Sequence, residues 1–336
     1  MRGLGFWTSA VLAFGLSLAA PGTSLADNVI PAKRLTLSEN TDLPGGDIAT
    51  MLDTTLEACE TACLTNKQCR AFTFNTKNGS CFPKSDVGES VFFGGAYSGQ
   101  VISAEKGVEG RAMARREELR FLPDWDIQPA TALAANLANL HVTNGFSAEE
   151  SLASARDAEG SGDFDAAYRF VGAATNLDDT ADNWLEYARL QVLAATRDEP
   201  NAMTLRTNAM LAAINAYLRS ENAAQRHTIL IQMGEALELV GRGRDTVQAL
   251  RLAQELQPRD DTAAALDDAI GKYGFRIVEN TVQSDTDRPR ICASFSEDLV
   301  KSGVDYSTFV QVPDAGMSVS SSRHRKPGLL PGVHGQ

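Results

Sequence analysis

Four of the chain's five cysteines lie between residues 59 and 81, in the stretch "EACETACLTNKQCRAFTFNTKNGSCFPK". A cluster of this density forms disulfides, holds a metal ion or supplies a reactive thiol. These three roles are favoured in different compartments, because disulfides persist only under oxidising conditions. The fold of this region therefore depends first on where the chain is sent.

The first 26 residues have the layout of a secretory signal peptide. Arg2 precedes an uncharged apolar run at 4–20, and the small residues Ser24 and Ala26 occupy the −3 and −1 positions of a cleavage site. The alternative is an uncleaved anchor, but the run is barely long enough to span a bilayer core of about 30 Å. We expect an exported chain, periplasmic or secreted, with no membrane association after cleavage.

The spacing of the cysteines also favours disulfides. Cys59 and Cys63 are four residues apart in a predicted helix, so they share one face and do not readily bridge each other. Cys69 precedes a predicted strand, and Cys81 lies in a second strand after an Asn-Gly turn. This pattern predicts a helix stapled to a hairpin.

Zinc is the main alternative for this cluster, and a catalytic thiol is another. Zinc sites usually show closer Cys-x-x-Cys pairs, and no histidine lies nearby. An even number of clustered cysteines in an exported protein normally pairs off, which disfavours a catalytic thiol. We predict no metal site and no cofactor.

The segments "CETACLTNKQC", "CRAFTFN" and "GSCFPK" resemble the PAN/Apple domain family over about residues 33–95. The resemblance implies the pairs Cys59–Cys81, from helix to hairpin, and Cys63–Cys69, which closes the loop after the helix. Domains of this family bind protein or carbohydrate and are not enzymes. The resemblance therefore implies a binding module, with a purely architectural role as the alternative.

Charge and motifs exclude other classes of function. The net charge of −12 argues against nucleic acid as a partner, since phosphate binding needs clustered positive charge. The chain has four histidines and contains no Gly-x-Ser-x-Gly elbow, phosphate loop or His-Glu-x-x-His motif. We expect no enzymatic activity and no catalytic residue.

The composition changes twice after the Cys-rich module. Residues 96–129 are interpreted as a linker, with Trp125 as a packing anchor between parts. Residues 130–272 are rich in Ala and Leu with helical periodicity, and Ser147 with Glu150 predicts a capping box. This region resembles tetratricopeptide-like repeats, for example in "GDFDAAYRFVGAATNLDD"; a generic helical bundle is the alternative. We interpret His227 as a hydrogen-bonded or exposed helix residue and not as a ligand.

Residues 273–312 read as the start of a β-domain. The segments "PRICASFSEDL" and "VDYSTFV" resemble the first β-sandwich domain of bacterial alpha-2-macroglobulin-like proteins, which are large periplasmic chains that trap proteases. Their thioester motif, Cys-x-x-Gln, does not occur here, and Cys292 is expected to be a free thiol. The predicted irregular tail at 313–336 suggests a truncated or frame-shifted product, with a naturally short protein as the alternative.

The sequence thus predicts an α+β multidomain fold: a disulfide-stapled module, a helical-hairpin region and a truncated β-sandwich. The favoured function is recognition of protein or carbohydrate by the N-terminal portion of a macroglobulin-like endopeptidase inhibitor, with proteases as partners only of the full-length family chain. The alternative is a stand-alone periplasmic adaptor. It would bind a glycan or peptide through the Cys-rich module and a protein through the helices.

Overall fold

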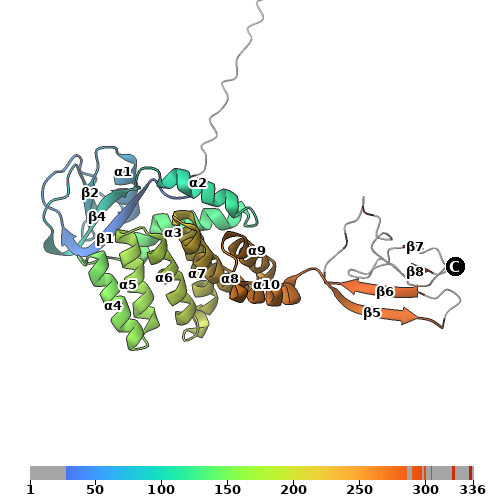
Figure 1. Cartoon of the computed structure of the whole chain (residues 1–336). Coiled ribbons are helices and arrows are strands. Elements are labelled where there is room, and N and C mark those ends of the chain that lie inside the picture. The colour runs from blue at the N-terminus through green and yellow to red at the C-terminus, as the bar shows by residue number, and fades with distance from the viewer. Residues whose placement is uncertain are drawn as a thin grey trace, which may run out of the picture.

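The computed structural model describes residues 28–285, 290–296, 299 and 304, together with the backbone of 320–321 and 333–334. The predicted signal peptide lies outside the described residues, as does nearly all of the strand predicted in "VDYSTFVQV". Figure 1 shows three parts in chain order: a sheet domain, an array of helices, and a β-hairpin that extends from the last helix. The mixed α+β class is therefore confirmed.

The sheet domain consists of one helix and four antiparallel strands. Their bounds are β1 (Lys33–Asp42), α1 (Leu56–Thr65), β2 (Ala71–Asn75), β3 (Ser80–Lys84) and β4 (Val91–Ser103). The strand order is β1-β4-β2-β3. Helix α1 begins where the Thr55 side chain accepts a hydrogen bond from the Ala58 N–H, which satisfies one of the unpaired donors of the first turn. Phe72 and Phe74 of β2 pack with the four cysteines beneath α1.

The helical array follows directly. Its elements are α2 (Val108–Glu118), α3 (Asp124–Leu140), α4 (Ala148–Gly160), α5 (Phe164–Leu177), α6 (Ala181–Ala194), a 3₁₀ turn η1 (Glu199–Asn201), α7 (Ala202–Arg219), α8 (Ala223–Leu239), α9 (Gly243–Leu256) and α10 (Asp260–Tyr273). From α4 onward each helix packs against the next, and α3 lies across α5 and α7 (Figure 1). The predicted capping box of Ser147 and Glu150 is present at the start of α4. Trp184, Tyr187 and Tyr217 are the largest side chains buried in the core.

The predicted linker at 96–129 is wrong. Strand β4 continues to Ser103, α2 follows, and α3 has begun by Asp124. Gly99 has a packing role in β4, because a Cβ there would lie 2.3 Å from Cε1 of Phe72. Trp125 is not an anchor, since 74% of it is exposed in the first turn of α3, where Ile127 is buried instead.

The sheet domain and the helices share an interface, so residue 130 is not a domain boundary. Val29 and Ile30, just before β1, belong to the core of the helices, and Ala138 of α3 belongs to the core of the sheet domain. The Thr131 hydroxyl donates to the Val29 carbonyl at 2.8 Å, and the Thr143 N–H donates to the Leu37 carbonyl at 2.8 Å. These contacts tie the two parts together, and both disulfides of the described chain lie within the sheet domain.

The C-terminal strands form a second small sheet. Their bounds are β5 (Ile277–Gln283), β6 (Arg290–Phe295), β7 (Ser320–Ser321) and β8 (Val333–His334), in the order β5-β6-β8-β7. The tail predicted to be irregular thus contributes two short strands. Apolar side chains of the β5–β6 hairpin are exposed, among them Phe275 (56%), Ile277 (56%) and Val282 (67%). Across the described residues, no helix is both long and apolar enough to cross a membrane.

Candidate functional site

Two disulfides hold α1 against the sheet. Cys59 is bonded to Cys81 of β3, with the Cα atoms 5.7 Å apart, and Cys63 is bonded to Cys69, with the Cα atoms 5.2 Å apart. These are the two pairs that the resemblance to PAN/Apple domains implied. All four residues are fully buried, so their sulfur atoms are structural and face away from any ligand. Cys292 is free and buried within the described residues.

The opposite face of the sheet has polar as well as aromatic side chains. The alternation of side chains in β-strands places Thr73, Phe82 and Ser98 in one row across β3, β2 and β4, on the side away from α1. The segment after β1 folds over part of this row, because the Leu43 N–H donates to the Thr73 hydroxyl at 3.1 Å. A cavity of about 220 Å³ remains beside it.

The cavity on this face has polar and aromatic walls, including Asp42, Asp47, Asn75, Phe82, Lys84 and Phe93. The Lys84 ammonium lies 2.5 Å from the Asp47 carboxylate and 3.3 Å from the Gly45 carbonyl oxygen. Its charge is therefore matched by that of Asp47. A ligand in this cavity would contact oxygen acceptors and aromatic rings, and the positive charge of Lys84 is already paired with Asp47.

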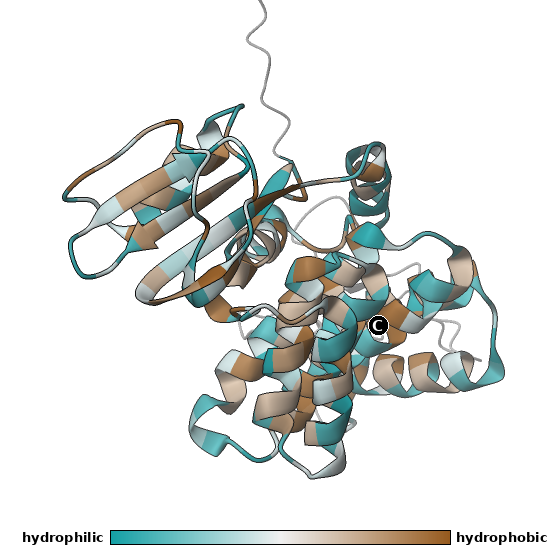
Figure 2. Cartoon of the chain, turned by 90° about the vertical axis from the view of Figure 1, so that its left-hand side faces the viewer, coloured by the Kyte–Doolittle hydropathy of each residue, from teal (hydrophilic) through white to brown (hydrophobic). Residues whose placement is uncertain are grey.

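The end of the β1–β4 ribbon beside this cavity presents apolar side chains to solvent. The β1–β4 register shifts between Glu39 and Thr41, after which Thr41 pairs with Phe92 and Asp42 with Val91. Strand β2 does not reach this end of the ribbon, since its pairing with β4 stops at Ala96. Phe92 is 85% exposed, Phe93 44% and Val91 45%. Figure 2 shows hydrophobic segments in the loops at the end of the sheet domain that is far from the helices.

Two adjacent phenylalanines in a strand could have revealed this feature from the sequence alone. Successive side chains of a strand point to opposite faces, so Phe92 and Phe93 cannot both enter one core. The sequence analysis included both residues in the PAN/Apple-like module without giving either of them a role. It therefore missed the most exposed aromatic residue of the described chain.

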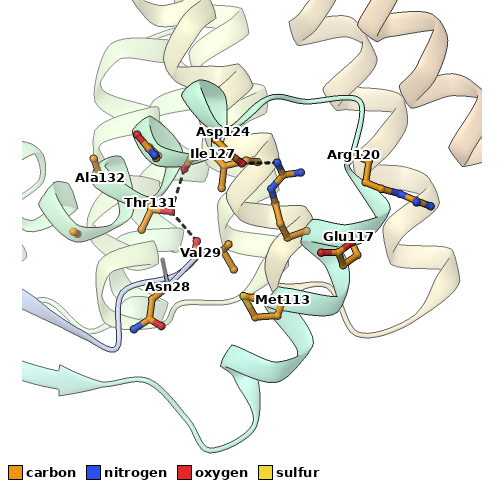
Figure 3. A pocket seen from close by; sticks show the side chains of 12 residues that line it. Asn28, Val29, Met113, Glu117, Arg120, Asp124, Ile127, Thr131 and Ala132 are labelled. Carbon is orange, nitrogen blue, oxygen red and sulfur yellow. Dashed lines mark hydrogen bonds and ion pairs between the residues drawn. The ribbon is translucent and has the colours of Figure 1, made fainter. Parts of the chain in front are cut away.

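A larger cavity, of about 620 Å³, lies between α2, α3 and the segment before β1 (Figure 3). Val29, Met113 and Ile127 form its apolar wall. At its edge the Arg116 guanidinium donates to the Asp124 carboxylate at 2.8 Å, so these two charges neutralise each other. The cavity is an apolar groove with paired charges at its edge and has no evident chemistry.

The buried histidines have structural hydrogen bonds. Nε2 of His227 lies 2.9 Å from the Thr262 hydroxyl, in agreement with its interpretation as a satisfied helix residue, and Nε2 of His141 lies 2.7 Å from the Tyr187 hydroxyl. Within the described part of the chain, no three His, Cys, Asp or Glu side chains are grouped so as to hold a metal ion.

Comparison with known families places the first domain. The family model of the PAN domain matches residues 34–108, so this segment is a PAN domain and extends beyond the end predicted at residue 95. PAN domains commonly bind proteins or carbohydrates. No curated protein matches the chain.

Proposed function

We propose that the chain is an exported, non-enzymatic recognition protein whose PAN domain binds a protein or carbohydrate ligand at the aromatic end of the β1–β4 ribbon. The observation that supports this proposal best is the exposure of Phe92, 85%, next to Phe93 and the cavity of about 220 Å³. Phe92 and Phe93 thus lie outside the core of the PAN domain, and PAN domains commonly bind ligands.

The chemistry of this surface suits either class of ligand. An aromatic ring can stack on the apolar face of a sugar or fill an apolar pocket of a protein partner. The carboxylates of Asp42 and Asp47 and the amide of Asn75 line the adjoining cavity and can accept or donate hydrogen bonds at its edge. Contact with exposed aromatic side chains would supply affinity, and the polar groups would supply orientation.

A glycan array probed with the labelled chain, followed by affinity measurements on its strongest ligand, tests this proposal. Phe92→Ala should weaken binding at least about tenfold, as loss of an aromatic anchor does at other interfaces. Leu52→Ala is the matched control, because Leu52 is also exposed, at 69%, but lies between β1 and α1 and outside the β1–β4 ribbon. Equal affinity of the Phe92→Ala variant and the wild type would place the binding surface elsewhere.

The exposed β5–β6 hairpin supports a second, wider proposal. Its apolar side chains, Ile277 and Val282 among them, need an opposing sheet, as the strands of a β-sandwich provide. This agrees with the resemblance to the first macroglobulin-like domain and with a recognition role at the N-terminus of such an inhibitor. Under this proposal the chain itself does not trap proteases.

A protease assay with two substrates tests the absence of trapping. A trap shields an enclosed protease from large protein substrates but leaves it accessible to small peptides. We expect digestion of both substrate sizes to be unaffected by the purified chain. Selective protection of the large substrate would show that the chain traps after all.

The alternative is a stand-alone periplasmic adaptor, in which tetratricopeptide-like helices bind a protein partner. Its support is the consecutive packing of α4 to α10. The DNA downstream of the codon for Gln336, read in all three frames, distinguishes the two proposals. A continuing macroglobulin-like sequence favours the inhibitor, and an intergenic gap favours the adaptor.

A further inference from the structure

A third cavity, of about 410 Å³, lies where the PAN domain meets the helices. Its walls come from β1, the end of β4, the start of α2, the α5–α6 loop and the α7–α8 loop. Elements far apart in the sequence therefore converge on one cavity. This space is separate from the aromatic ribbon end, which lies at the other end of the PAN domain.

Two buried arginines and one aspartate form the floor of this cavity. Nε of Arg219 lies 2.5 Å from Oδ1 of Asp179, and Nε of Arg34 lies 3.6 Å from Oδ2 of the same residue. The side chains of Arg34 and Arg219 are only 10% and 2% exposed. Two guanidinium groups therefore share one carboxylate on the floor, and the charge of Asp178, which lines the same cavity, also acts on Arg34.

The Arg219 guanidinium is incompletely satisfied. Its Nη1 donates to the Asn215 carbonyl and side-chain oxygens at 3.1 Å and 2.8 Å, and its Cζ lies 5.1 Å from the centre of the Trp184 ring. Its Nη2 is buried and, within the described residues, has no hydrogen-bond partner. A buried charged donor without an acceptor is unfavourable and calls for an explanation, such as a bound ligand or water.

Two further observations make the floor receptive to an anion. Burial lowers the pKa of Arg34, so its charged form gains from an additional negative neighbour. The first turn of α6, at Thr180 and Ala181, lines the same cavity and presents the positive end of the helix dipole. The interior of the cavity thus favours a negatively charged group.

The rim has the opposite charge. The exposed acids Glu105, Asp178 and Asp182 line it, and Asp182 accepts a hydrogen bond from Nε2 of Gln225 at 2.7 Å. Arg111 is the cation of the rim, and it lies 4.0 Å from Glu221. The rim therefore repels a simple anion, and the floor repels a simple cation.

We propose that this cavity binds a small zwitterion of the amino-acid class. The carboxylate of the ligand lies at Arg219, Arg34 and the N-terminus of α6, and its ammonium group lies at the acidic rim. This arrangement matches each charge of the ligand with its opposite. A volume of about 410 Å³ suits a single amino acid or a dipeptide.

Titration calorimetry of the whole chain with the free amino acids and simple dipeptides tests the proposal. For the tightest ligand, the N-acetyl derivative removes the ammonium charge and the amide removes the carboxylate. We expect each derivative to bind at least about tenfold more weakly than the zwitterion. Equal binding of either derivative, or no binding of any ligand up to about 10 mM, would overturn the proposal.

Variants on the exposed rim locate the site without disturbing the buried arginines. Asp182→Asn should weaken binding of the zwitterion severalfold relative to the wild type. It should also weaken binding of the amide derivative, because both ligands keep the ammonium group. Asp165→Asn is the matched control, since Asp165 also lies in the first turn of a helix, α5, but outside the cavity. Loss of binding in both variants, or in neither, would contradict the assignment.

Discussion

His141 shows how a buried side chain at the end of α3 is held among the helices. It caps the C-terminus of α3, and Nε2 lies 2.7 Å from the Tyr187 hydroxyl, whereas Nδ1 is buried without a partner among the described residues. Burial, with a smaller effect from the charge of Arg169, lowers the pKa of His141 to about 4. The imidazole is therefore neutral in the folded chain at neutral pH.

This pKa predicts an acid-dependent loss of stability. Unfolded His141 binds a proton near pH 6.5, and folded His141 only near pH 4, so its contribution is complete above about pH 6.5 and is lost as the pH falls toward 4. Between pH 7 and 5 the free energy of unfolding should fall by about 2 kcal/mol through this residue. Denaturant unfolding at both pH values, compared with His141→Gln, measures it. An equal loss in both proteins would contradict the prediction.

Gly172 supplies the space for the His141 ring. A Cβ at Gly172 would lie 2.2 Å from Cδ2 of the ring, so Gly172→Ala should destabilise the chain by about 1–3 kcal/mol through overpacking. The exposed Gly271, in α10, has nothing near its Cβ position, and Gly271→Ala should stabilise by about 0.5–1 kcal/mol. Thermal unfolding of the two variants compares them. Destabilisation of the same size in both would show that space around His141 is not the cause.

At the scale of elements, the two disulfides should contribute unequally. The bond Cys59–Cys81 spans 22 residues and Cys63–Cys69 spans 6, and a longer closed loop restricts the unfolded chain more. Loop-closure entropy predicts a loss of about 3 kcal/mol for the Cys59→Ala/Cys81→Ala variant and about 2 kcal/mol for Cys63→Ala/Cys69→Ala. Denaturant midpoints of both variants test this order. A reversed order would show that native-state packing outweighs the loop entropy.

The elements that the sequence predicts well have signals in their own residues. Thr55 caps α1 and Ser147 with Glu150 caps α4, because capping depends on side chains a few positions apart. The second half of β4 could not be predicted in this way. Gly99 is required there by the ring of Phe72, and that contact exists only in the folded sheet.

The candidate sites also differ in whether nearby residues in the sequence reveal them. The cysteine pattern identifies the PAN domain, and the adjacent Phe92 and Phe93 contain a local signal for the aromatic ribbon end. The cavity between the PAN domain and the helices contains no such signal. Arg34 and Arg219 are separated by most of the folded region, and only the packing of β1 against α5 and α7 against α6 brings both to Asp179.

At the scale of the whole molecule, the interface changes what a separated helical region should do. The sequence analysis placed the boundaries of the helical region at residues 130 and 272. The structure shows that this cut removes Val29, Ile30 and α2, which contribute to the same core. A fragment of 130–272 should still be helical but should melt at lower temperature than 28–273, because apolar side chains lose their burial. Circular dichroism melts of the two fragments measure this, and equal melting temperatures would restore the original boundary.

The β5–β6 hairpin should behave as a separate unit from the rest of the molecule. It extends from the end of α10, and its side chains Phe275, Ile277 and Val282 are more than half exposed, so little burial opposes its local opening (Figure 1). The PAN domain and the helices are instead joined by a buried interface, and the PAN domain is held internally by two disulfides.

Limited proteolysis should therefore remove the C-terminal strands first. We expect a stable fragment that ends between about residues 272 and 285, because a hairpin without an opposing sheet opens more readily than a packed core. Mass spectrometry of the digest identifies the end of the fragment. Digestion of the helices before the hairpin would mean that the exposed apolar strands are covered in solution, for example by a second copy of the chain. The same digest at several protein concentrations separates these cases, since only protection by self-association would disappear on dilution.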